Sequence, residues 1–391
     1  MPTVAIASSR LVNVMPMSTE AVDHQPSPAH SGAQALIGTL PRHYRRLGLT
    51  RGVIEPWEDG LRTAAADGTF EWWYFDAHLD DGSTITVEFH TKPPYVSPGA
   101  PLTPFVLVTR TTPDGVRTDW THVAEPEQFA SSSAQCDVAI GVNSFAADAH
   151  GWRIHVEIDG LVGDFTLRPE LEPWRPETGH VFFGALEQHY IAWLPVAARG
   201  AVDAQLTIDG RTERLTGSGY HDHNWGNVAP RKVLDHWYWG RARVGDYTVV
   251  TLMFVSHARY DKVPLPAVMV AKGDRIIASA VGIDRIGFTG SDVVEHAGTG
   301  VPVARRLEYT ITHGEDTFRV TFEHRHDAFT LDFGAAGAYL RFMGDVTIEH
   351  RCGGASTVES DQALWELLYF GARAHAHLST SARAAIVGHQ A

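Results

Sequence analysis

Residues 217–226, which read GSGYHDHNWG, decide the fold, and residues 236–243, which read HWYWGRAR, follow after a short gap. Together these segments concentrate acids, imidazoles, an amide and large aromatic side chains. An ordinary strand carries β-branched residues on one face and scattered polar groups on the other. The composition of the two segments therefore indicates the wall of a pocket.

Outward from this stretch, the chain repeatedly alternates apolar and polar residues. Residues 84–90, 152–158 and 202–208 alternate strictly, and each run lies next to an Asp-Gly turn. Such alternation is typical of strands with one buried face, and Asp-Gly is a strong hairpin signal. Many short strands at regular spacing predict an antiparallel β architecture of two barrels or sandwiches.

One segment departs from this pattern, because residues 360–374 have helical spacing. Leu364, Leu367 and Leu368 lie three or four residues apart, and Ser360 occupies a suitable N-cap position. This spacing puts the three leucines on one face of a helix. We therefore expect a C-terminal α-helix packed on the outside of the β structure.

Composition limits the classes of partner and the cellular compartment. The formal charge of −14 and the lack of a basic run argue against nucleic acid or an anionic membrane as the main partner. Cys136 and Cys352 are too few for a disulfide framework, which favours a reducing cytoplasm. Neither a signal peptide nor a transmembrane run is evident, so we expect a cytoplasmic protein without stable membrane insertion.

Three motifs carry a resemblance to a known family: EWWYF at residues 71–75, GYHDHNWG at 219–226 and WYWG at 237–240. They resemble the hallmarks of the carotenoid 1,2-hydratase (hydroxyneurosporene synthase) and AttH-like superfamily, which is similar to lipocalins. This version of the motifs resembles the branch of lipocalin-like Diels-Alderases, which form rings in polyketide biosynthesis. The resemblance covers roughly residues 50–375 and implies no metal or cofactor.

The expected fold is therefore all-β, with two lipocalin-like antiparallel β-barrel or sandwich domains and a C-terminal α-helix. A chain of 391 residues exceeds the size of one typical hydrophobic core, which also favours two domains. We expect a disordered leader over residues 1–45, an N-terminal β domain over 46–228, and a C-terminal β domain with the terminal helix over 229–391. The ligand cavity is expected at or near their junction.

Strand alternation divides the central motif between two faces. One face carries Tyr220, Asp222 and Asn224, and the other carries His221, His223 and Trp225. Three interpretations of residues 221–223 remain open. The two histidines and His236 could hold zinc or iron, the motif could form a buried polar corner, or it could contact a ligand.

We expect Asp222, Asn224 and Tyr238 to be the catalytic residues. Burial would raise the pKa of the Asp222 carboxyl and make it a proton donor, and any of the three could polarise a conjugated carbonyl. The expected substrate-binding residues are Glu71, Trp73, Tyr220, His221, His223, Trp225, Trp237, Trp239 and Arg241.

Structural roles compete with these assignments. Glu71 could instead pair with Arg241 or Arg243, and at least one of Trp72 and Trp73 should pack in a core, because neighbours on a strand face opposite ways.

The favoured function is a cofactor-independent cyclase, that is, a pericyclase. Its substrate is a large, apolar, polyketide-derived polyene, and it forms a ring in that substrate by [4+2] cycloaddition. A carotenoid-type alkene hydratase would instead protonate a double bond, stabilise the cation over aromatic faces and add water. A non-catalytic lipid- or pigment-binding protein is the third hypothesis.

Overall fold

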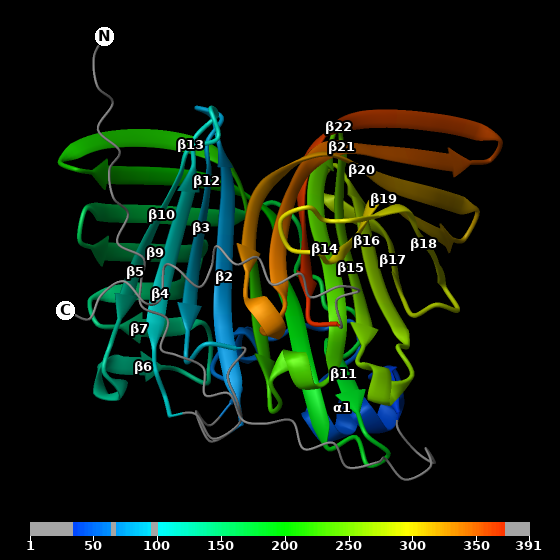
Figure 1. Ribbon diagram of the computed structural model, residues 1–391, viewed down its shortest axis with the longest axis horizontal. Helices are drawn as coiled ribbons and strands as arrows, with labels where there is room; N and C mark the ends of the chain where they lie inside the picture. Colours follow the sequence, from blue (N-terminus) through cyan, green and yellow to red (C-terminus); the bar gives the residue numbers. More distant parts are fainter. Residues whose placement is uncertain (1–33, 64–67, 95–100, 372–391) are drawn as a thin grey trace. The chain divides into compact units, whose positions relative to one another are not determined.

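The computed structural model describes residues 34–63, 68–94 and 101–371, and in these residues antiparallel strands form two large sheets (Figure 1). The thirteen strands of sheet A are β1 (Ala35–Ile37), β2 (Phe70–Leu79), β3 (Thr84–His90), β4 (Phe105–Thr111), β5 (Arg117–Val123), β6 (Phe129–Ser131), β7 (Asp137–Ile140), β8 (Asn143–Asp148), β9 (Gly151–Ile158), β10 (Leu161–Pro169), β11 (His180–Phe183), β12 (His189–Ile208) and β13 (Arg211–Gly226).

The nine strands of sheet B are β14 (Leu234–Val244), β15 (Tyr247–Ser256), β16 (Pro264–Lys272), β17 (Arg275–Val281), β18 (Ile286–Glu295), β19 (Pro302–His313), β20 (Asp316–Asp332), β21 (Ala338–Cys352) and β22 (Ala355–Tyr369). The described helices are α1 (Pro41–Leu47) and the short 3-10 turns η1 (Pro56–Asp59), η2 (Pro126–Gln128), η3 (Pro230–Lys232), η4 (Ala258–Tyr260) and η5 (Gly334–Ala336). None of the described helices is long and apolar enough to cross a bilayer.

Most strands pair with their neighbours in sequence, and three pairings bring distant segments together: β1–β11, β2–β13 and β14–β22. In sheet A the order is β5-β4-β3-β2-β13-β12-β10-β9-β8-β7-β6, with β11 on β12 and β1 on β11. In sheet B the order is β17-β16-β15-β14-β22-β21-β20-β19-β18. The β2–β13 pairing sets the EWWYF motif beside the central motif, and the β14–β22 pairing sets the last strand beside WYWG.

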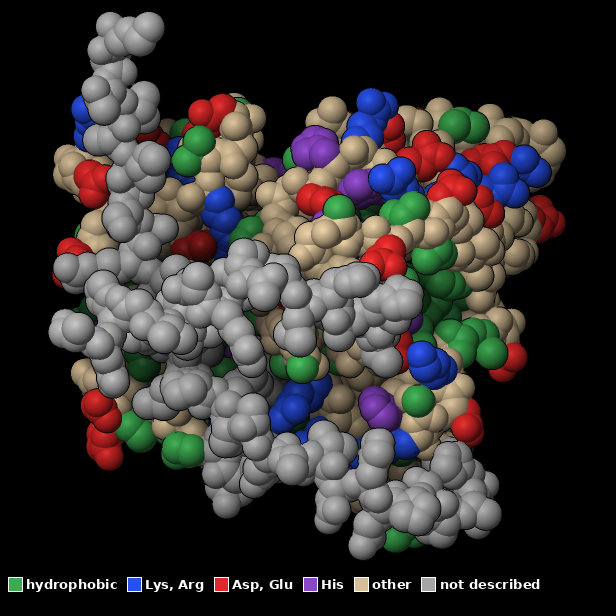
Figure 2. Space-filling view, viewed as in Figure 1, with side chains coloured by type: hydrophobic (Ala, Val, Ile, Leu, Met, Phe, Trp, Pro, Cys, Tyr) green, Lys and Arg blue, Asp and Glu red, His purple; other side chains and the backbone are tan. Residues whose placement is uncertain are grey.

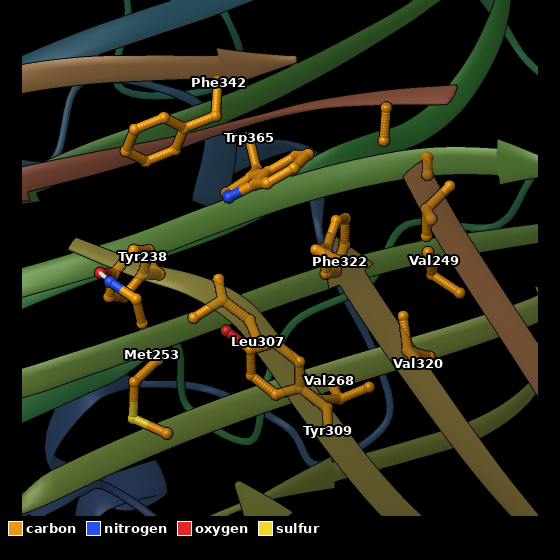
Figure 3. Packing of buried hydrophobic residues seen from close by; sticks show 14 of the residues in the cluster. Tyr238, Val249, Met253, Val268, Leu307, Tyr309, Val320, Phe322, Phe342 and Trp365 are labelled. Carbon is orange, nitrogen blue, oxygen red and sulfur yellow. Dashed lines mark hydrogen bonds between the residues drawn. The ribbon is translucent and has the colours of Figure 1, made fainter. Parts of the chain in front are cut away.

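The buried side chains form three cores. One lies within sheet A and one within sheet B, where Tyr238, Phe322 and Trp365 pack together (Figure 3). The third lies at the junction of the two sheets and includes residues of β2, β12 and β13 together with residues of β14 and β15. Because the strands at the junction bury both faces, β15 reads as a continuous apolar run rather than an alternating one.

The antiparallel β class predicted from the alternation is confirmed, but the expected C-terminal helix is wrong. Residues 360–369 belong to β22, which pairs with β14 on one side and β21 on the other. Ala363, Trp365 and Leu367 face the core of sheet B. Hydrogen bonding to two neighbouring strands therefore overrides a weak helical spacing. Residues 372–374 of the expected helix lie outside the described residues.

The expected leader over residues 1–45 extends too far. Residues 1–33 lie outside the described part of the chain. Within residues 34–45, β1 pairs with β11 and α1 begins at Pro41. The helix ends at Leu47, and the next residue, Gly48, has a left-handed backbone conformation. The expected domain boundary at residue 228 falls between β13 and β14. That each sheet is an independent domain stays a prediction.

Charged side chains of both signs are intermixed at the upper right of Figure 2, over sheet B. Cross-strand ion pairs account for part of this pattern: Arg319 pairs with Glu308 and Glu349, and Arg325 pairs with Asp345. The two arginines are exposed and the acids are partly exposed, so each pair contributes little to stability.

A buried ion pair links the two sheets. Arg241 of β14 donates through Nε and a terminal nitrogen to the carboxylate of Asp76 on β2, and both residues are buried. Tyr74 of β2 donates to Asp76 over 3.0 Å and accepts from Arg341 of β21 over 2.8 Å. The junction is therefore held by directed polar contacts as well as by apolar packing.

We expect Asp76→Ala to lower the free energy of unfolding by about 3–5 kcal/mol, because it leaves the Arg241 guanidinium buried without its counterion. The double variant Asp76→Ala/Arg241→Met should recover much of this loss. Urea denaturation followed by tryptophan fluorescence and far-UV circular dichroism measures both. Equal losses in the single and double variants would show that the ion pair does not hold the junction.

Candidate functional site

A cavity lies at the junction of the two sheets. Its volume is about 530 Å³, which includes space open to solvent. Its walls are formed by Trp72 and Tyr74 of β2, Ile191 and Trp193 of β12, Asp222 and Asn224 of β13, Pro230 of η3, Trp237 and Trp239 of β14, Leu252 and Phe254 of β15, and Glu366 of β22. The cavity is thus mainly aromatic and aliphatic, with a few polar groups.

The register of the β2–β13 pair explains which residues face this cavity. Asp222 lies opposite Tyr74 and Asn224 lies opposite Trp72, and residues directly opposite each other in an antiparallel pair share a face. The predicted separation of the two faces of β13 is therefore confirmed, with Asp222 and Asn224 toward the cavity. Tyr220 shares their face but is fully buried behind Asp222.

Three donors hold the Asp222 carboxyl group in place. Trp193 Nε1 and the Tyr220 hydroxyl donate to Oδ2 over 2.7 and 2.8 Å, and Asn224 Nδ2 donates to Oδ1 over 2.7 Å. Burial raises the pKa of Asp222 from 3.8 to about 7, although the three hydrogen bonds and nearby His221 oppose the rise. The carboxyl therefore exchanges a proton near neutral pH.

Glu366 is a second carboxyl in the cavity, and it comes from the opposite sheet. Trp237 Nε1 donates to its Oε1 over 3.1 Å, and the Tyr339 hydroxyl donates to its Oε2 over 2.7 Å. Burial raises the pKa of Glu366, while the positive charge of Arg341 opposes the rise. Glu366 is not among the expected site residues, because residues 360–374 were expected to form a helix. The signal was a single acid within the otherwise apolar run 363–369.

The aromatic pair of β2 divides between the cavity and the core of sheet A. Trp72 lines the cavity, whereas Trp73 is fully buried in the sheet A core. Trp73 donates through Nε1 to the Asp59 carbonyl over 2.9 Å and stacks on His223 at 4.6 Å. The expectation that one tryptophan packs in a core is confirmed, and the cavity receives Trp72 rather than Trp73.

The two motif histidines form a buried polar cluster in sheet A. His221 contacts the Tyr74 carbonyl through Nδ1 at 2.9 Å and the Asp59 carboxylate through Nε2 at 3.1 Å. Burial alone would lower the pKa of His221, but the Asp59 carboxylate and the Tyr74 carbonyl raise it overall. His223 contacts Glu71 Oε1 through Nε2 at 2.8 Å. This arrangement fits the interpretation of a buried polar corner.

Glu71, expected to bind substrate, does not line the cavity, and it does not form the alternative ion pair with Arg241 or Arg243. Besides His223, its carboxylate accepts hydrogen bonds from the backbone amides of Arg62 and Thr63, both over 2.7 Å. These bonds fasten the segment after η1 to the sheet.

Among the described residues, one cluster could hold a metal ion in sheet A: Asp59, Cys136 and His221, with donor atoms within 4.8 Å of one another. Trp152 also donates to Asp59 over 2.9 Å, so hydrogen bonds account for the position of this carboxylate. His236, the third ligand in the alternative metal interpretation, contacts the Asp235 carboxylate at 2.8 Å.

The remaining expected residues take other positions. Tyr238 lies on the opposite face of β14, in the core of sheet B, and its hydroxyl accepts from the Ala304 amide over 3.0 Å. Burial raises the pKa of Tyr238 to about 12. Trp225 packs in the sheet A core. Of the expected site residues, the cavity brings together Asp222, Asn224, Trp237 and Trp239.

The raised pKa of Asp222 predicts a pH-dependent cost to the folded state. Well below pH 3.8 the Asp222 carboxyl is neutral in both the folded and the unfolded state. As the pH rises toward 7, the unfolded chain ionises first and the folded state loses stability. Asp222→Asn removes this loss. The free energy of unfolding of the variant, relative to that of the wild type, should therefore rise by about 4 kcal/mol between pH 4 and pH 8, at about 1.4 kcal/mol per pKa unit.

Urea denaturation at several pH values measures this difference, and Asp203→Asn, which alters a half-exposed carboxyl, is the control. A difference between Asp222→Asn and the wild type that stays flat with pH would contradict the assigned ionisation.

Known proteins were compared with this chain by sequence and by structure. The family model described as Diels-Alderase-like matches residues 63–286. A quinolone epoxide rearrangement protein from Emericella nidulans is 27% identical over 205 residues, which cover 46% of this chain and 53% of that protein. A hydroxyneurosporene dehydrogenase from Chlorobaculum tepidum is 28% identical over 207 residues, which cover 45% of this chain and 54% of that protein.

The match thus spans about half the length of these curated relatives. The crystal structure of a protein described as AttH from Nitrosomonas europaea shares the fold with a TM-score of 0.57 and 18% identity, over 82% of this chain and 98% of that one. The resemblance drawn from the three sequence motifs is confirmed. The chain belongs to the Diels-Alderase-like family.

Proposed function

We propose that this chain is a cofactor-independent cyclase that folds a linear, polyketide-derived polyene and promotes ring formation by [4+2] cycloaddition. The observation that carries the proposal is the aromatic cavity between the sheets with the Asp222 carboxyl in its wall. Family membership supports a ring-forming reaction. A relative named for the rearrangement of an epoxide supports chemistry in which the substrate changes its bonds within one molecule.

The cavity supports this reaction first by restricting the substrate. A flexible polyene must bring its diene and dienophile into contact, and binding in a folded conformation removes much of that entropic cost. Trp72, Trp193, Trp237 and Phe254 offer flat, apolar faces from both sheets. Aromatic rings contribute large contact areas with few rotatable bonds, which suits an extended apolar chain.

Asp222 supplies the polar contribution. In its protonated form it can donate to a carbonyl conjugated with the dienophile, which lowers the barrier to cycloaddition by withdrawing electron density. Trp193, Tyr220 and Asn224 fix the carboxyl group before the substrate arrives. Asn224, expected to be catalytic, then acts as a positioning residue, because its amide nitrogen is engaged by Asp222.

The chemistry needs no electron transfer and no second substrate, so we propose that no cofactor takes part. The free thiols of Cys136 and Cys352 suit a reducing compartment, and we extend the proposal to a cytoplasmic location.

Product mass separates the proposed cyclase from the alternatives. The protein is incubated with a linear polyenoyl tetramate in water enriched in ¹⁸O, beside a carotenoid, and the products are analysed by liquid chromatography with mass spectrometry. We expect an isomeric, unlabelled product from the tetramate. A gain of labelled water would instead identify a hydratase, and binding without turnover would identify a carrier.

The same assay tests the role of Asp222. Asp222→Asn keeps the size of the side chain but loses the acidic proton, so we expect kcat to fall by about a hundredfold or more, with a smaller change in KM. Asp203→Asn, far from the cavity wall and half exposed, should retain activity. Unchanged kcat in Asp222→Asn would remove Asp222 from the mechanism.

A further inference from the structure

The indole of Trp239 has an unusual position in the cavity wall. Trp239 lines the cavity and is 9% exposed, yet its Nε1 is buried without a hydrogen-bond partner among the described residues. Native proteins rarely leave a buried donor unpaired, because the group loses its hydrogen bond to water and gains nothing in return. Such a donor in a cavity wall is suited to a ligand that supplies the missing acceptor.

The other buried donors of the cavity are already engaged. Trp193 Nε1 and Asn224 Nδ2 donate to Asp222, and Trp237 Nε1 donates to Glu366. Trp72 is only partly buried, so water can reach its indole. Trp239 therefore differs from the neighbouring tryptophans in having a buried donor that none of the described residues accepts from.

The surroundings of Trp239 hold the indole in place. Its ring packs edge-on against Tyr74, with centroids 6.0 Å apart, and lies 5.3 Å from the ring of Tyr220. Across the neighbouring strands, its backbone lies opposite Leu252 and Glu366. Since β14 is bordered by strands on both sides, a ligand would meet a donor whose position is set in advance.

We propose that Trp239 is a substrate-binding residue whose indole N–H donates to a neutral carbonyl oxygen on an otherwise apolar ligand. The inference rests on the proposed function in that the ligand occupies the same cavity. It names an oxygen acceptor that the substrate must carry in addition to its polyene chain.

The charge of the cavity favours a neutral acceptor over an anionic one. Asp222 and Glu366 both line the cavity, and an added carboxylate would lie near these two carboxyl groups. A ketone, ester or amide carbonyl accepts the same hydrogen bond without that repulsion. The ligand is therefore expected to present a neutral carbonyl to Trp239.

A buried water is the competing partner. Trp239 also borders a smaller hollow lined by Asp76, Arg241 and Arg341, where polar groups could hold a water molecule. A water bound there would satisfy the indole permanently and leave the ligand with no role at Nε1. Ligand binding distinguishes the two partners.

The test compares fluorescent polyenes that differ in one oxygen-bearing group. The probes are the methyl ester of cis-parinaric acid, the free acid, and the hydrocarbon with the same four double bonds, titrated at pH 8 against the wild type, Trp239→Phe and Trp365→Phe. Phenylalanine keeps an aromatic ring but lacks the N–H. Trp365 is the matched control, because its Nε1 is also buried and unpaired and it borders the same smaller hollow, but it does not line the cavity.

We expect the wild type to bind the ester about three- to tenfold more tightly than the hydrocarbon, the range expected for one added hydrogen bond, and more tightly than the acid. The preference for the ester should disappear in Trp239→Phe and persist in Trp365→Phe. In the wild type labelled with ¹⁵N-tryptophan, the ester should shift the Trp239 indole resonance and the hydrocarbon should leave it largely unmoved.

Three results would overturn the inference: no binding of the probes, no preference for the ester in the wild type, or the same preference in Trp239→Phe. The NMR measurement uses the wild type, so it still decides the matter if the variant folds poorly. Failure of the proposed function is recognised separately: an ester preference that depends on Trp239 together with no cyclised product refutes the cyclase and retains the binding role.

Discussion

The strands at the junction must bury both of their faces, and the rest of the structure depends on this constraint. On β13, one face carries His221 and His223 into the core of sheet A, and the other turns Asp222 and Asn224 toward the cavity. On β14, Tyr238 packs in sheet B while Trp237 and Trp239 face the cavity. Alternation along single strands therefore joins two cores to one site.

The same constraint explains how the polar residues of the motif divide their work. Asp59 and Glu71 contact the two histidines and fasten the segment around η1 to the face of β13 that packs in the core of sheet A. On the face of β13 toward the cavity, Asp222 accepts hydrogen bonds from Trp193, Tyr220 and Asn224. In residues 220–224, the odd-numbered side chains therefore stabilise the core of sheet A, and the even-numbered side chains form or support the cavity wall.

Much of this arrangement could be predicted from the sequence. The period of two gave the β class and the division of Tyr220, Asp222 and Asn224 from His221, His223 and Trp225. It could not show which face of β2 meets the cavity, because that depends on the β2–β13 register, which sets Tyr74 opposite Asp222. For this reason Trp73 and Glu71 were expected where Trp72 and Tyr74 lie.

Pairing between distant strands also explains the other differences. Leu364, Leu367 and Leu368 fit a helix as well as a strand when they are considered alone. Pairing with β14 and β21 makes this segment a strand, and the same pairing places Glu366 in the cavity wall. The partner of Arg241 was hidden in the same way, because Asp76 lies on another sheet.

The two walls of the cavity come from sheets that fold around separate cores, and this gives them different freedom to vary. Asp222 is fixed by residues of sheet A, whereas Leu252 and Phe254 belong to sheet B and only border the space. A substitution at either of these positions reshapes the cavity and replaces none of the three donors to Asp222. A scaffold of this kind can exchange one ligand for another over evolutionary time while it keeps the buried carboxyl group of Asp222.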